Sequence, residues 1–426
     1  MPASADPAPD SAPDPGADPA AATNARRPAA GPLQGLRVLD IATIIAGPSA
    51  ASLLADFGAD VVKLELPGVG DGARGFPPHK DGQPLWWKVT NRGKRMATLD
   101  LRRPEGAALL RALLPRFDVL VENFRPGTLD GWGLTREVLW QAQPRLVILR
   151  VTGFGQTGPY RDRPGFARLF EAMGGLAHIT GEADGEPMHA GYPLADNIGG
   201  LFGAVGVLAA LWKRARDPDA PGEEIDLALL ESTLKLLEFL PIEQALLGQV
   251  RQRSGNASQY SAPAAVYRTG DGRWVSLSGS TNALFAANCR AIGRPDLASD
   301  PRYASNALRV QHAAELNVLF GTWCAALPLD QVLAAFNAAG GTIAPVYDIA
   351  QIVADPQVQA RGAVAPVPDA HFGSVPMATV VPRFHHDPGA IRCSGGALGA
   401  DTEAFYRDEL GLDADTLAGL RARGVV

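Results

Sequence analysis

The sequence predicts an α/β protein with a large doubly wound, Rossmann-like domain and a smaller α+β domain. Near its start, Arg37–Ile41 and Asp60–Glu65 are short apolar runs typical of strands, separated by a helical segment that ends at Gly58. A strand, a helix and a second strand in this order predict a parallel pair joined by a crossover helix. Two later apolar runs, at 117–121 and 146–151, are typical of buried parallel strands, with helical segments between them.

The second half of the chain has a different pattern. Residues 251–263 are polar and rich in turn formers, which indicates a domain junction, and Thr269–Gly272 lies between two strand-like runs and predicts a hairpin. We expect a disordered tail rich in Pro, Ala and Asp at 1–33, a large α/β domain at 34–225, linker helices at 226–255, a small α+β domain at 256–355 and a C-terminal segment at 356–426.

Composition excludes several classes of protein. A net charge of −6 over 426 residues provides no basic field, so nucleic acid is not an expected partner. Cys289, Cys324 and Cys393 lie far apart with neither disulfide nor metal-type spacing, which favours reduced thiols in a cytoplasmic protein and no metal site. No apolar run approaches the ~18 residues that span a bilayer, so no membrane is expected. The N-terminal stretch has no apolar segment, so we expect it to be neither a signal nor a transit peptide.

Three features near the predicted strands are candidates for binding an anionic ligand. Ala46–Pro48 turns the chain from a strand into a helix whose first N–H groups are free, although a plain tight turn explains it equally well. Val121–Gly127 follows a buried strand, where ligands bind in open α/β sheets, and offers an Asn amide and a Phe ring. No G-x-G-x-x-G is present, so a dinucleotide site is not supported. A cluster of basic residues would neutralise the phosphates of a nucleotide, or else it forms an ordinary solvated surface. Its members are Arg74, Arg92, Lys94, Arg95, Arg102 and Arg103.

Asp196 is the most informative carboxylate. It precedes the apolar helical run Leu201–Trp212, a position that favours an N-cap. A helix N-terminus also keeps a carboxylate ionised, as covalent catalysis requires. Gly199 and Gly200 would leave room for a bulky ligand and offer backbone N–H groups to an oxyanion.

The chain resembles the family III CoA transferases, the group that includes formyl-CoA and carnitine CoA transferases. The similarity runs from Leu36 to Val426, and its marks are Gly35–Asp40, Ala46–Pro48, Gly58–Glu65, Gly70–Asp71 with Arg74, Val121–Gly127 and Gly153–Pro159. The resemblance implies that Asp196 is the nucleophile and becomes an aspartyl-CoA thioester. It also implies that coenzyme A is contacted by Ile44, Ile45, Ala46, Arg74, Leu99, Arg102, Asn123 and Phe124.

The resemblance further implies an intertwined homodimer in which the C-terminal segment returns to the large domain. Acyl-CoA and a carboxylic acid are then the substrates, with no permanently bound cofactor. Two departures are visible. Ile45 occupies the position of a catalytic Gln in formyl-CoA transferase, and that enzyme's run of four glycines is absent, so formyl or oxalyl chemistry is disfavoured and the intermediate must be shielded differently.

Two alternatives remain open at this stage. An α-methylacyl-CoA racemase on the same fold pairs the matching Asp with a His as second base, but this chain has Phe166 there, and a phenyl ring cannot remove an α-proton. A non-catalytic acyl-CoA-binding protein would be expected to lack the acidic nucleophile, which is present as Asp196.

The segment that follows Gly155 is most similar to members that use short dicarboxylates. We therefore expect succinyl-CoA as donor and a short dicarboxylate as acceptor. The free carboxylate of such an acceptor would pair with Arg161, Arg163 or Arg168, unless these arginines are ordinary surface residues.

Overall fold

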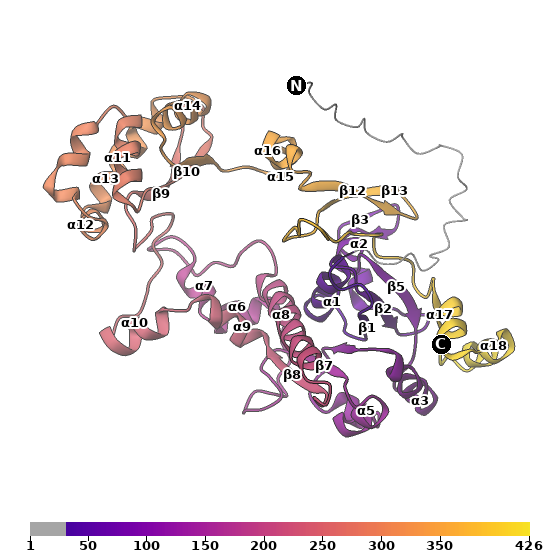
Figure 1. The fold of residues 1–426 in the computed structure, drawn as a ribbon. Helices are drawn as coiled ribbons and strands as arrows, with labels where there is room; N and C mark the ends of the chain where they lie inside the picture. Colours follow the sequence, from indigo (N-terminus) through magenta and orange to yellow (C-terminus); the bar gives the residue numbers. More distant parts are fainter. Residues whose placement is uncertain (1–30) are drawn as a thin grey trace, which may run out of the picture. The chain divides into compact units, whose positions relative to one another are not determined.

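A computed structural model describes residues 31–426 (Figure 1). The predicted tail at 1–33 lies almost entirely outside the described residues. The chain divides into two compact units. Unit 1 comprises the chain up to Thr152, Gly200–Asp226 and Ala365–Val426, and unit 2 comprises Gly153–Gly199 and Leu227–Val364.

Unit 1 is built on a six-stranded sheet in the order β5-β2-β1-β6-β7-β8. Pairing is parallel between β5 and β2, β2 and β1, β1 and β6, and β6 and β7, which confirms the predicted central parallel sheet. Residue Leu39 of β1 lies opposite Val62 on one side and Leu120 on the other. The strands are β1 (Arg37–Asp40), β2 (Asp60–Glu65), β5 (Lys94–Thr98), β6 (Val119–Glu122), β7 (Val147–Thr152) and β8 (Glu223–Ala228).

Helices surround this sheet and bury an aliphatic core. Helix α17, the last but one in the chain, packs against β5 and α3, and its Phe405 and Tyr406 enter the same core as β1 and β2 (yellow and indigo in Figure 1). The C-terminal segment therefore belongs to the same unit as the N-terminal strands. The further elements are α1 (Ala46–Asp56), α2 (Leu85–Thr90), α3 (Pro104–Leu113), α4 (Thr128–Gly131), α5 (Arg136–Ala142), α17 (Thr402–Leu410), α18 (Ala414–Ala422) and the short strands β3 (His79–Lys80) and β4 (Gln83–Pro84).

Unit 2 contains a three-stranded antiparallel sheet and several helices. The hairpin predicted around Thr269–Gly272 is confirmed, because β9 and β10 pair with Tyr267 opposite Val275. The strands are β9 (Ala264–Arg268), β10 (Trp274–Ser278) and β11 (Ile343–Pro345). The helices are α6 (Ala167–Met173), α7 (Leu176–Ile179), α9 (Leu229–Leu236), α10 (Leu240–Leu247), α11 (Asn282–Ala291), α12 (Asn306–Gln311), α13 (Ala313–Ala325), α14 (Leu329–Ala339), α15 (Ile349–Ala354) and α16 (Pro356–Ala360). A two-stranded sheet of β12 (Val364–Asp369) and β13 (Gly373–Ala378) begins where unit 2 ends.

Helix α8 (Leu194–Arg216) carries one boundary between the units, after Gly199. It has 23 residues, and an 18-residue window within it has a mean hydropathy of 1.6, so by length and composition it is apolar enough to cross a membrane and the expectation that no run approaches this length is wrong. Core helices of soluble proteins pass the same test. At Gly203 the helix packs closely against strand β7, since a Cβ at this position would lie 2.9 Å from the side chain of Leu149.

Candidate active site

The turn between β1 and α1 lies where the strand order reverses. We call residues 41–45 the β1–α1 turn. Strand β1 connects onward to β2 on one side and pairs with β6 on the other, and ligands bind at such switch points, beyond the carboxyl ends of the strands. The Asn123 amide, just after β6, donates to the carbonyl of Thr43 and accepts from its N–H, both at 2.7 Å. The structure thus brings two predicted segments together, but it uses the Asn123 side chain to hold the turn.

Helix α1 begins at Ala46 without a side-chain cap. Within the part of the chain that the structure describes, the backbone N–H groups of Ala46 and Gly47 have no hydrogen-bond acceptor. A Cβ at Gly47 would lie 2.4 Å from that of Ala42, so only glycine allows this close approach. The helix therefore presents two free donors and the positive end of its dipole at the predicted CoA-binding position.

The remaining predicted CoA contacts are variously placed. Ile45, Ala46 and Leu99 are buried, and Ile44 is partly exposed. Phe124 packs edge-on against Trp132 with ring centroids 5.1 Å apart. The contact of these residues with coenzyme A stays a prediction.

The residues of the predicted basic cluster are paired with carboxylates. Arg74 binds Glu65 through two hydrogen bonds of 2.7 Å, and its guanidinium lies 3.8 Å from the centre of the Trp87 ring. Every cation of the cluster has a carboxylate partner, but Arg102 and Arg103 share Asp100 and are both exposed, so phosphate binding stays a prediction at these two residues. The other pairs are Arg92 with Asp56, Lys94 with Asp40, Arg95 with Asp60, and both Arg102 and Arg103 with Asp100.

Asp196 lies in the first turn of α8, whose first residue is Leu194. The expectation of an N-cap is therefore wrong by three residues, because the capping position precedes Leu194 and is Pro193. Only 7% of Asp196 is exposed, and within the described residues its carboxylate has no hydrogen bond or ion pair. An unpaired, desolvated carboxylate is more basic and more nucleophilic than one in water.

The environment of Asp196 raises its pKa to about 7, first through burial and second through the charge of Glu171. The expectation that the helix N-terminus keeps this carboxylate ionised must be corrected, because desolvation and a second carboxylate outweigh the helix dipole. A carboxylate with a pKa near neutrality is typical of catalytic positions.

Glu171 of α6 is a site residue that the sequence reasoning missed. Its side chain is buried, and one oxygen accepts from the backbone N–H of Leu194 at 3.0 Å. The other oxygen lies 3.1 Å from Nδ1 of His189. Glu171 thus connects α6 to the first turn of α8. The only signal for it in the sequence is a carboxylate within the apolar helical stretch 167–173.

Gly199 and Gly200 serve helix packing. A Cβ at Gly199 would lie 2.2 Å from Leu229, and one at Gly200 would lie 2.8 Å from the Cβ of Ser49 on α1. Both are inside α8, where helical hydrogen bonds occupy the backbone N–H groups. The interpretation of these glycines as oxyanion donors and as space for a ligand is therefore wrong.

The three candidate arginines for the acceptor lie on the surface of unit 2. Arg161 pairs with the exposed Asp162, Arg163 stacks on Tyr160 at 3.7 Å from the ring centre, and Arg168 is exposed. Within the described residues none of them forms an ion pair or hydrogen bond with Asp196. The position of the racemase base is occupied by Phe166, which is 69% exposed.

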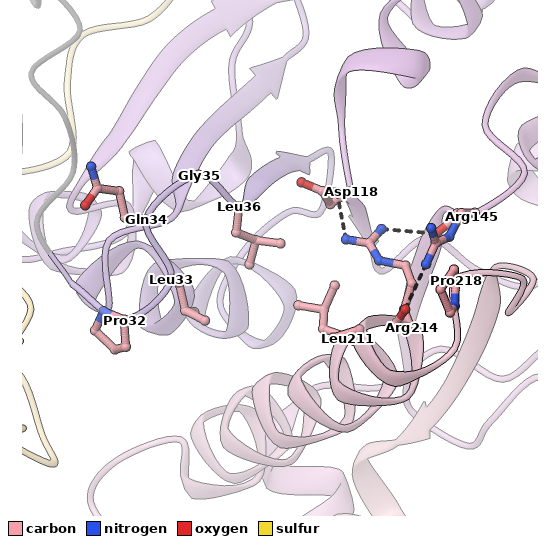
Figure 2. A pocket seen from close by; sticks show the side chains of 11 residues that line it. Pro32, Leu33, Gln34, Gly35, Leu36, Asp118, Arg145, Leu211, Arg214 and Pro218 are labelled. Carbon is pink, nitrogen blue, oxygen red and sulfur yellow. Dashed lines mark hydrogen bonds and ion pairs between the residues drawn. The ribbon is translucent and has the colours of Figure 1, made fainter.

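One open cavity of about 530 Å³ lies at the amino ends of the parallel strands, opposite the end that carries the β1–α1 turn (Figure 2). It is lined by residues that precede strands β1, β6 and β7, including Leu36, Asp118 and Arg145. Arg214 spans it and donates to Asp118 and to the carbonyl of Arg145. No predicted site residue lines this cavity. Among the described residues no group of His, Cys, Asp and Glu that could hold a metal is found.

Comparison with known proteins decides between the open alternatives. The model of "CoA-transferase family III" matches residues 33–402. The chain belongs to this family. Family III CoA transferases are enzymes, so the non-catalytic alternative is set aside, and the expected transferase activity is confirmed.

Several relatives of this family III CoA transferase are similar over nearly their whole length. The chain is 41% identical to a succinyl-CoA–D-citramalate CoA-transferase of Chloroflexus aurantiacus, covering 93% of this chain and 98% of that one. It is 42% identical to the beta subunit of a succinyl-CoA–L-malate CoA-transferase of the same organism, with the same coverage. A crystal structure of a CaiB/BaiF family protein from Brucella suis superposes with a TM-score of 0.78 at 33% identity, covering 89% of this chain and all of that one.

Proposed function

We propose that this enzyme transfers coenzyme A from succinyl-CoA to a short dicarboxylate through a thioester on Asp196. The observation that carries the proposal is the carboxylate of Asp196, which is buried, unpaired among the described residues and has a pKa raised to about 7. The succinyl-CoA donor and the dicarboxylate acceptor are supported by the names of two similar transferases. The β1–α1 turn supports CoA binding through the free N–H groups of Ala46 and Gly47.

The proposed reaction balances without ATP or metal. A carboxylate oxygen of Asp196 attacks the thioester carbonyl and expels the CoA thiolate, which leaves a mixed anhydride. The thiolate then attacks the aspartyl carbonyl carbon, releases succinate and forms the aspartyl-CoA thioester. The acceptor carboxylate attacks this thioester and expels the thiolate, which finally attacks the acceptor's carbonyl and regenerates the Asp196 carboxylate. Each step exchanges one acyl bond for another, and holding the thiolate near the anhydride replaces collision with proximity.

A CoA-exchange assay read by mass spectrometry tests the proposal. The protein is incubated with succinyl-CoA and a pool of short mono- and dicarboxylates, with an Asp196→Ala variant in parallel. We expect new dicarboxyl-CoA species from the wild type alone, together with free succinate. If no acyl-CoA is formed but the α-proton of a branched acyl-CoA exchanges with deuterated water, the racemase alternative replaces the proposal.

The pH dependence of the transfer is expected to follow Asp196. Since the nucleophile must be ionised, kcat/KM for succinyl-CoA should be low in acid and should rise with pH through about 7, which gives the pH profile an acidic limb. Glu171→Gln removes the neighbouring charge that contributes to the raised pKa, so this limb should move to lower pH. Glu186→Gln, at an exposed carboxylate of the same unit, is the matched control. A limb that stays at the wild-type pH in Glu171→Gln would contradict this role.

We also propose that the enzyme is a homodimer, intertwined as in the family that it resembles. Two faces support this. On α8, Leu201, Val205, Leu208 and Trp212 are spaced for one face of the helix and are between 37% and 66% exposed. On α10, no residue is buried although most are apolar. A second copy of the chain would cover such faces.

Light scattering tests the homodimer. We expect twice the chain mass of 44.7 kDa for the wild type, and loss of the dimer or aggregation for Leu201→Asp with Val205→Asp. Arg116→Asp, at an exposed residue of unit 1, should leave the mass unchanged. A wild-type mass of one chain would refute the proposal.

The three cysteines are all free thiols, and we infer a cytoplasmic enzyme from this.

A further inference from the structure

Ile44 adopts an unusual backbone conformation in the β1–α1 turn. Its φ is 70°, in the left-handed region that β-branched residues avoid. Ile45 follows it as the residue that precedes helix α1, so the conformation of Ile44 determines where the free N–H groups of Ala46 and Gly47 lie. Such a conformation persists only when surrounding contacts enforce it, and such strain is typical of ligand-binding positions.

Asp71 supplies those contacts. Its buried carboxylate accepts from the backbone N–H of Ile44, with distances of 3.0 and 3.2 Å to its two oxygens. It also accepts from the N–H of Ala73 at 2.9 Å, and its own N–H donates to Glu65 at 3.0 Å. Asp71 is therefore fixed in place by its own loop before it binds the turn.

Lys63 extends this arrangement to the other side of the turn. Its buried ammonium lies 3.2 Å from Asp71 and 3.8 Å from Asp40. It also donates to the carbonyl of Ala42. The Lys63 ammonium on strand β2 thus links the Asp71 carboxylate, which holds Ile44, to the carbonyl of Ala42 in the same turn.

We propose that Asp71 and Lys63 are positioning residues for acyl-CoA. They hold Ile44 in the left-handed conformation, so that the N–H groups of Ala46 and Gly47 are aimed at the ligand before it arrives. This inference rests on the proposed CoA binding by the turn. It goes further by assigning ligand affinity to two buried side chains that do not themselves contact the ligand. Preorganisation of this kind saves the ordering cost of binding.

A double-mutant cycle tests this assignment. Asp71→Ala removes the acceptor for Ile44 and should raise KM for succinyl-CoA about tenfold or more, with a smaller change in kcat. Ile44→Gly makes the left-handed conformation free of strain. In that background, Asp71→Ala should raise KM by less than about threefold, since the turn no longer needs enforcement. The affinity for CoA, measured by calorimetry, should show the same coupling.

Asp369 provides a matched control. Like Asp71 it is buried, pairs with a lysine, Lys88, and accepts from two backbone N–H groups. Unlike those of Asp71, both donors lie in its own loop, so Asp369 does not hold the β1–α1 turn. Asp369→Ala should lower Tm without changing KM for succinyl-CoA. If Asp71→Ala does not fold, Asp71→Asn is used instead. Asn keeps one acceptor oxygen but loses the ion pair with Lys63. We expect it to raise KM for succinyl-CoA by less than Asp71→Ala does, and we expect this rise to disappear in the Ile44→Gly background.

Two outcomes would overturn the inference. One is an equal rise in KM for Asp71→Ala with Ile44 and with Gly at position 44. The other is an unchanged KM with a lowered Tm, as for the Asp369 control. Neither outcome is confused with failure of the proposed function, because that failure appears as absent transfer by the wild type itself.

Discussion

Replacement of Asp196 by Asn is expected to abolish CoA transfer. Asn has nearly the same shape but lacks the carboxylate oxygen that we propose attacks the thioester, so kcat/KM should fall at least about 1,000-fold. The measurement is acyl-CoA formation from succinyl-CoA over a range of pH. Asn197→Ala, one residue further along α8, alters only a side chain that donates to the carbonyl of Pro193 and should keep transfer within about tenfold of the wild type.

The same substitution should stabilise the fold above neutral pH. The folded-state pKa of Asp196 is about 7 against an ordinary value of 3.8. Between these two values the folded protein binds a proton that the unfolded chain does not bind, so the free energy of unfolding falls as pH rises through this window. Asn carries no charge at any pH, so it removes the free-energy cost of burying an ionised carboxylate. We expect Asp196→Asn to be more stable at pH 8 by up to about 4 kcal/mol, since each pKa unit corresponds to about 1.4 kcal/mol, and indistinguishable at pH 3.

Replacement of Lys94 by Met should strongly destabilise the protein. The ammonium of Lys94 is buried and donates to Asp40 and to the carbonyl of Pro48, both at 2.8 Å, and to Asn91 at 2.9 Å. Burial, only partly offset by Asp40, lowers its pKa to about 8. Without Lys94 the buried Asp40 carboxylate keeps only the more distant ammonium of Lys63, at 3.8 Å, so we expect a cost approaching that of a broken buried ion pair, about 3–5 kcal/mol.

Urea unfolding measures this cost. Lys213→Met is the control, because Lys213 is exposed and pairs with Glu223 at 3.0 Å on the surface, where a pair contributes at most about 1 kcal/mol. Equal midpoints for the two variants would show that the buried pair contributes no more than a surface pair.

Much of unit 1 is predictable because its strands are nearly continuous apolar runs. The runs that contain β1, β2, β6 and β7 were expected, since strands buried on both faces need apolar side chains throughout. Strand β5 was missed. It opens with Lys94 and Arg95, and these polar residues suit a buried strand only because Asp60 on the adjacent strand β2 and Asp40 on the next strand, β1, pair with them. Such pairing is a long-range property that a local pattern does not reveal.

The parts of the candidate site that are marked by local sequence motifs were predictable. The parts that depend on contacts between residues far apart in the sequence were not. Asp196 and the β1–α1 turn were identified from local motifs and the family resemblance. The role of Glu171 depends on its contacts with Leu194 and His189, which lie 18 to 23 residues away along the chain. The glycines of α8 were misinterpreted because local sequence cannot distinguish a close helix contact from space for a ligand.

Domain boundaries show the same limit. Residues 153–199 were expected in the large domain, yet the compact units place them with Leu227–Val364. The apolar pattern of this segment does not specify which core it joins. The return of the C-terminal segment to the first unit was implied by the family resemblance alone.

Capture of the aspartyl-CoA thioester tests the central claim most directly. The wild type is mixed with succinyl-CoA without an acceptor, quenched in acid and digested, and the peptides are weighed by mass spectrometry. We expect the peptide that contains Asp196 to gain the mass of coenzyme A less one water, and to lose it when an acceptor dicarboxylate is added before the quench. Active transfer with no such adduct on that peptide, or with the adduct on another residue, would contradict Asp196 as the nucleophile.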